Sequence, residues 1–110
     1  MIVPIDKNDQ RSLRVLCREA VECLQHVFEL PVPKLIASVD HAENIVVHVR
    51  DGLIERLRAE GPPRWRKPLD QVNMALSLIA GVTYPSNKIH KQYVIDACRV
   101  LTDVQADLPE

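Results

Sequence analysis

Helical periodicity interrupted by prolines is the feature that most restricts the fold of this chain. Apolar residues recur at spacings of three and four in four separate segments, which places them on one face of an α-helix. The gaps between these segments contain Pro31, Pro33, Pro62, Pro63, Pro68 and Pro85. Proline lacks an amide donor and disfavours helix in the residue before it, so we expect the helices to break there. The predicted helices cover about residues 8–29, 39–60, 68–82 and 87–106.

Four amphipathic helices joined by short connections are typical of an antiparallel bundle. The chain has 110 residues and is 46% apolar, which suits one domain with an ordinary core. We therefore predict an all-α fold, a small antiparallel four-helix bundle, in a single helical domain over residues 1–110. Asp6 or Asn8 is the expected cap of the first helix, and Ser86 is the expected cap of the fourth.

One part of the second predicted helix also has features of a β-strand. Residues 45–49 are rich in β-branched side chains, and Asp51 with Gly52 forms a hairpin-turn signal. The spacing of three and four continues through Leu53 and Leu57, whereas strand-like alternation does not. The pattern therefore favours a helix over a strand.

The second helix has an apolar arc that covers about half of its circumference, more than one neighbouring surface would cover. Met74, Leu78 and Ile95 also lie outside the main apolar stripes of their helices. We expect another molecule to cover this surplus, and predict a homodimer with the second helix in its interface. Glu43 and Arg50 lie within the arc, where each would meet the other across a two-fold axis. The alternative is that both side chains extend to solvent.

The segment 61–68 is the most distinctive part of the sequence, and we expect it to be a loop. It holds the only tryptophan, Trp65, together with Arg64, Arg66 and Lys67. Such a loop is suited to anchor in a protein partner or to stack a nucleic-acid base, while the cations contact carboxylate or phosphate. For Trp65 itself, we favour a position folded back as a lid over one end of the bundle, with the cations around it solvated.

Pairs of carboxylates suggest a second possibility, a metal-dependent all-α enzyme that hydrolyses nucleotides. Glu19 and Glu22 are three residues apart, as are Asp40 and Glu43, and acidic pairs on facing helices can hold a divalent cation. Glu19 and Glu22 fall opposite the apolar stripe of their helix, so we expect them to face water. That placement counts against a metal site.

Other catalytic signatures are absent from the sequence. The chain has only three glycines, and these form no phosphate-binding loop. No serine lies in a GxSxG-like turn, and the histidines and their acidic neighbours supply too few ligands for zinc. The sequence therefore indicates no catalytic residue, no metal and no cofactor.

The predicted function is a non-catalytic, cytoplasmic helical-bundle protein that acts through protein–protein interaction, as an adaptor or regulatory module. No apolar run is long enough to span a membrane, and the first residues lack signal-peptide features. Nucleic-acid binding through the basic Trp65 segment is a further alternative. It is not favoured, because one basic stretch on a chain with a net charge of −1 is not the field of a general nucleic-acid binder.

Overall fold

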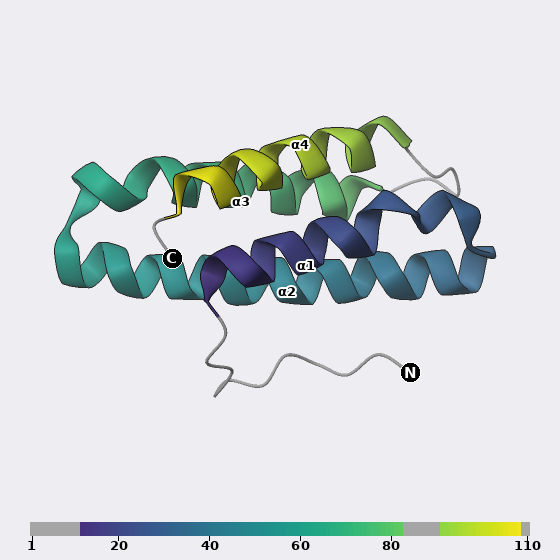
Figure 1. Cartoon of the computed structure of the whole chain (residues 1–110), viewed down its shortest axis with the longest axis horizontal. Coiled ribbons are helices and arrows are strands. Elements are labelled where there is room, and N and C mark those ends of the chain that lie inside the picture. The colour runs from purple at the N-terminus through teal and green to yellow at the C-terminus, as the bar shows by residue number, and fades with distance from the viewer. Residues whose placement is uncertain (1–11, 83–90, 109–110) are drawn as a thin grey trace.

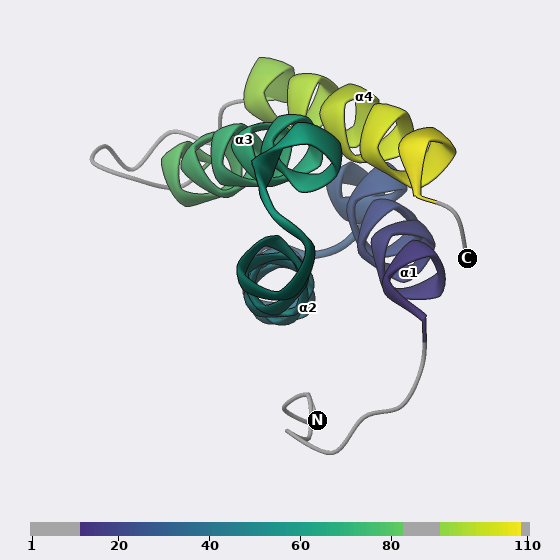
Figure 2. The ribbon, with the colours of Figure 1, turned by 90° about the vertical axis from the view of Figure 1, so that its left-hand side faces the viewer.

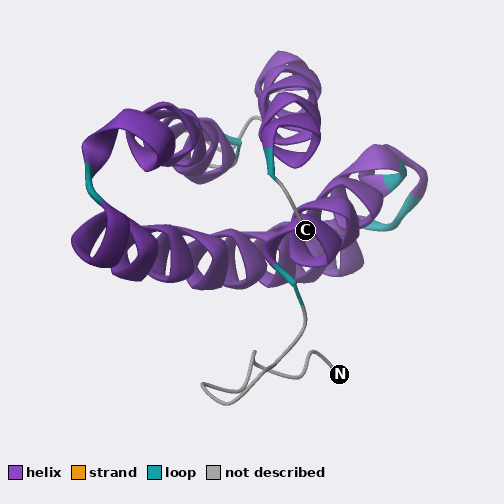
Figure 3. Cartoon of the chain, turned by 60° about the vertical axis from the view of Figure 1, so that its left-hand side comes forward, coloured by secondary structure: helices purple, strands orange, loops and turns teal. Residues whose placement is uncertain are grey.

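The computed structural model describes residues 12–82 and 91–108, and these form an all-α fold (Figure 1). The helices are α1 (Leu13–Gln25), the 3-10 turn η1 (Val27–Glu29), α2 (Val32–Glu60), α3 (Pro62–Gly81) and α4 (Lys91–Asp107). No strand occurs in the described residues (Figure 3). The predicted fold class is therefore confirmed.

The four long helices run in alternating directions along the bundle, as the colour ramp of Figure 1 shows. Each packs against two neighbours: α1 and α3 both contact α2 on one side and α4 on the other. The end-on view in Figure 2 shows the helices at the four corners of this arrangement. The 29 residues of α2 span the 42 Å long dimension of the molecule. The antiparallel four-helix bundle is confirmed.

The β-branched segment 45–49 lies inside α2 and is helical, as the spacing predicted. Ile45, Val46 and Val49 are completely buried, because α1 and α3 pack against α2 from different directions. Burial in the bundle outweighs the modest helix propensity of valine and isoleucine.

The start of α2 differs from the prediction. The helix begins at Val32 rather than near residue 39, with Pro31 as its N-cap residue and Pro33 in the first turn. Amide groups in the first turn have no intrahelical partner, so a proline there removes no hydrogen bond. These prolines therefore mark the beginning of α2 and not a gap before it.

The expected loop over residues 61–68 is also wrong. Gly61 alone connects α2 to α3, and residues 62–68 form the first two turns of α3. Gly61 makes the turn from α2 with a φ of 94°, in the left-handed region that favours glycine. Pro62 and Pro63 occupy the first two helical positions, where prolines are tolerated. Pro68 lies inside α3 and is buried. Because proline has no amide hydrogen, one backbone hydrogen bond of the helix is missing there, but the helix continues.

The expected starts of the first and fourth helices, with the caps Asp6, Asn8 and Ser86, lie outside the described residues. In the described chain, Ser12 is the N-cap of α1, and its Oγ accepts a hydrogen bond from the Val15 amide at 3.1 Å. The bond satisfies one of the amides that have no partner within the helix.

Replacement of Ser12 by alanine is expected to lower the free energy of unfolding by about 1 kcal/mol, because the Val15 amide loses its acceptor. Ser12→Asp keeps a capping oxygen and adds a charge that favours the helix N-terminus, so we expect it to retain most of the stability. Urea denaturation followed by circular dichroism measures both effects. Equal losses in the two variants would show that Ser12 does not cap α1.

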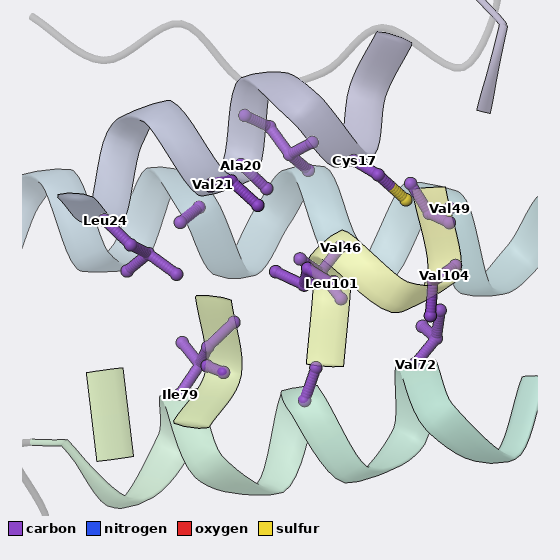
Figure 4. Close-up of a cluster of buried hydrophobic side chains, with 14 of the residues drawn as sticks. Cys17, Ala20, Val21, Leu24, Val46, Val49, Val72, Ile79, Leu101 and Val104 are labelled. Carbon is purple, nitrogen blue, oxygen red and sulfur yellow. The ribbon is translucent and has the colours of Figure 1, made fainter. Parts of the chain in front are cut away.

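The core is built mainly from aliphatic side chains that all four long helices contribute (Figure 4). Labelled members are Cys17, Ala20, Val21 and Leu24 of α1, Val46 and Val49 of α2, Val72 and Ile79 of α3, and Leu101 and Val104 of α4. All of them are buried. This composition follows from the scarcity of aromatic residues, which make up 4% of the chain.

The chain's own helices cover the apolar arc of α2 in large part, which is more than we expected. Ala42, Ile45, Val46, Val49 and Leu53 are buried in the single chain. The other residues of the arc, Val47, Ile54 and Leu57, are half-buried. The physical reason is that α2 contacts two long neighbours, which together cover a wider arc than one would. The single chain thus covers most of the arc, and a dimer interface on α2 stays a prediction.

Candidate functional site

Trp65 lies in the first turn of α3 and is only 3% exposed. Two guanidinium groups lie over its ring. The Cζ atoms of Arg56 and Arg64 are 5.2 Å and 4.9 Å from the ring centroid. Contacts of this length between a cation and an indole face are favourable. Trp65 therefore closes one end of the bundle as a lid and is not an exposed anchor, because the helical start of α3 turns it inward.

The cations beside Trp65 are exposed and paired with carboxylates. The pairs are Arg64 Nη1 with Glu60 Oε1 at 3.8 Å, Arg66 Nε with Asp70 Oδ1 at 3.3 Å, and Lys67 Nζ with Asp107 Oδ2 at 3.5 Å. Exposed pairs of this kind contribute little to stability and exchange readily. These carboxylates therefore largely neutralise the positive charge of Arg64, Arg66 and Lys67. The predicted loop did not place the carboxylates beside them.

A shallow groove runs along the outer face of the first half of α3, with a volume of about 780 Å³. We call this surface the α3 groove. Its lining residues are Pro62, Pro63, Arg66, Lys67, Asp70, Gln71 and Met74. Most of the lining is apolar, and Met74 is 56% exposed. The groove thus combines an uncovered apolar floor with charged edges.

Sequence reasoning found Arg66 and Lys67 but missed the rest of the groove. The signal was present, because Pro62, Arg66, Asp70 and Met74 are spaced by four and share one face of a helix. The sequence predicts a loop for residues 61–68, and in a loop a spacing of four does not place side chains on one face. Recognition of Pro62 and Pro63 as first-turn residues would have revealed the face.

Glu43 and Arg50, the other predicted partner-binding residues, lie on α2 and do not line the α3 groove. Arg50 is half-exposed, and its Nη2 lies 3.2 Å from Oδ1 of its neighbour Asp51. Glu43 is half-buried. The structure therefore does not bring these two residues together with Arg64, Arg66 and Lys67.

The four carboxylates of the predicted metal alternative do not form a cluster with other ligands. Across residues 12–82 and 91–108, no group of three or more histidine, cysteine or acidic side chains is arranged to hold a metal ion. Glu22 and Asp40 are exposed, but Glu19 does not simply face water. Its Oε1 lies 4.0 Å from Nε2 of His41 on α2, because α2 borders a wider part of α1 than its apolar stripe indicated.

The cysteines at positions 17, 23 and 98 form no disulfide. Burial raises the pKa of the Cys23 thiol, and the nearby carboxylates of Glu19 and Glu22 raise it further. Burial also raises the pKa of the Cys98 thiol. Both thiols therefore stay protonated near neutral pH, the unreactive form.

Among residues 12–82 and 91–108, a second group of exposed apolar side chains lies around η1 and the start of α2. Its exposed residues are Phe28, Leu30, Val32 and Ile36. The ammonium group of Lys91 lies 5.8 Å from the centroid of the Phe28 ring, so this surface borders the described start of α4. His26 and Glu29 flank Phe28 on this surface, with 3.5 Å between Nδ1 and Oε2.

Comparison of the chain with known protein families, with curated proteins and with solved structures yields no match. None of the described helices is both long enough and apolar enough to cross a lipid bilayer.

Proposed function

We propose that this protein is a non-catalytic interaction module that binds another polypeptide through the α3 groove. The observation that carries the proposal is the groove itself, about 780 Å³ of mainly apolar surface on a helix face that the described chain leaves open. Exposed apolar surface bordered by polar groups is characteristic of protein-binding sites. An adaptor or regulatory role in the cytoplasm is part of the same proposal.

The shape of the groove favours a polypeptide over a small molecule. It follows α3 from residue 62 to residue 74, a length of about 18 Å at the rise of an α-helix. Small-molecule sites enclose most of their ligand, whereas this groove is open along its length. An amphipathic helix laid along α3 would bury its apolar face on Pro63 and Met74, with Lys67 and Asp70 to set its orientation.

The two alternative functions draw less support from the described residues. Nucleotide hydrolysis depends on convergence of Glu19, Glu22, Asp40 and Glu43, and no metal-binding group of three forms among the described side chains. Nucleic-acid binding depends on an unneutralised basic patch and an accessible tryptophan. The cations are paired with carboxylates, and Trp65 is buried.

A photoreactive amino acid at position 74 tests the proposal directly. We expect benzoylphenylalanine at position 74 to form covalent adducts with a polypeptide when the full chain is expressed and irradiated in cells. The matched control is the same substitution at Ile95, which is 49% exposed on the outside of α4 and outside the groove. Adduct yields at position 74 that do not exceed those at position 95 would contradict the proposal.

A further inference from the structure

We propose that the polypeptide that occupies the α3 groove is a second copy of this chain, with the two α3 helices antiparallel across a two-fold axis. This inference rests on the proposed function, because it concerns the same surface. It moves the expected dimer interface from α2 to α3. The evidence is the order of side chains along the groove.

Four groove residues form a continuous seam along α3. Pro63, Lys67, Asp70 and Met74 are separated by four, three and four residues, the spacing of positions that face a partner helix in a coiled coil. All four line the α3 groove. The described part of the chain therefore leaves this seam open to another helix.

The seam is complementary to itself when it is reversed. In a two-fold antiparallel pair, residues equally far from the axis on opposite sides stand face to face. An axis level with the peptide bond between residues 68 and 69 puts Pro63 opposite Met74 of the second copy, and Lys67 opposite Asp70 of the second copy. Symmetry repeats each contact, which creates two apolar contacts at the ends and two ion pairs near the axis.

The present partners of the charged groups do not oppose this pairing. Lys67 contacts Asp107 at 3.5 Å, and Asp70 contacts Arg66 at 3.3 Å, in each case between exposed side chains. Such pairs exchange at little cost. Asp70 has two carboxylate oxygens, so it can accept from Arg66 of its own chain and Lys67 of the second copy together.

The expected dimer is weak. The seam from Pro63 to Met74 is about 17 Å long at the rise of an α-helix, so a single helix pair of this length buries less than a standard-size interface. We therefore expect a dissociation constant in the micromolar range, and a dimer fraction that rises with protein concentration.

Charge reversal across the seam provides the test, with sedimentation equilibrium of the full chain from about 1 µM to 1 mM as the measurement. Lys67→Asp and Asp70→Lys each place two like-charged contacts in the dimer, and we expect each to raise the dissociation constant at least about tenfold. The double variant Lys67→Asp/Asp70→Lys exchanges the two charges and is expected to restore the dimer. An equimolar mixture of the two single variants is expected to form a heterodimer.

The control is Lys34→Asp, a charge reversal on an exposed residue of α2 outside the groove, which should leave the dissociation constant unchanged. Circular dichroism verifies that every variant is folded. A monomeric mass at every concentration, or a dimer that the single reversals do not weaken, would overturn the inference. Adducts from position 74 to a different polypeptide would overturn the second-copy assignment alone and leave the proposed function standing.

Discussion

Truncation of Leu101 to alanine is expected to lower the free energy of unfolding by about 3–5 kcal/mol, because it opens a cavity in a close-packed core. Leu101 is completely buried on α4, in the same cluster as Val46 of α2 and Ile79 of α3 (Figure 4). A loss of this size should lower the melting temperature by roughly 15–25 °C in a domain of about 100 residues. Urea and thermal denaturation followed by circular dichroism measure both quantities.

Ile95→Ala on the same helix is the matched control. Ile95 is exposed, so its truncation removes little buried surface, and we expect a change within about 0.5 kcal/mol. Similar losses for Leu101→Ala and Ile95→Ala would mean that α4 does not pack on the bundle through the face described above.

Trp65→Ala is expected to lower the free energy of unfolding by about 3–5 kcal/mol. The substitution removes the buried ring that closes the α2–α3 end of the bundle and the face on which the Arg56 and Arg64 guanidiniums stack. Trp65→Phe keeps an aromatic face and removes Nε1, which is buried without a hydrogen-bond partner. We therefore expect the phenylalanine variant to lose only about 1–2 kcal/mol.

Fluorescence gives an independent check of this position, since Trp65 is the only tryptophan of the chain. The native protein should emit at short wavelength, resist quenching by acrylamide, and shift to longer wavelength in urea. Native emission typical of a water-exposed indole, together with a loss of less than about 1 kcal/mol for Trp65→Ala, would contradict the lid position.

The fold class and most of the core were predictable because helical periodicity is a local property of the chain. Leu16, Leu24, Leu53 and Leu101 lie on stripes that the spacing of apolar residues identifies, and all four are buried. The choice of helix over strand for residues 45–49 also depended on spacing, and the structure confirms it. Short connections then left little freedom beyond an antiparallel arrangement.

Proline was misread because its effect depends on where it falls in a helix. Pro31, Pro33, Pro62 and Pro63 occupy helix starts, where a missing amide removes no bond, and they were treated as breaks. This error shortened α2 and α3, and it turned the first two turns of α3 into a loop. The α3 groove went unrecognised for this reason, whereas the lid position of Trp65 agrees with its burial.

Local spacing along the chain thus specified that there are four amphipathic helices and which side of each faces inward, since both follow from the 3.6-residue repeat. The packing of the helices in space settled how much of α2 is covered, which way Trp65 points and which helix face stays open. Those properties depend on the number and direction of neighbouring helices. Contacts such as Lys67 with Asp107 join residues forty positions apart, beyond the range over which a repeat in the sequence carries information.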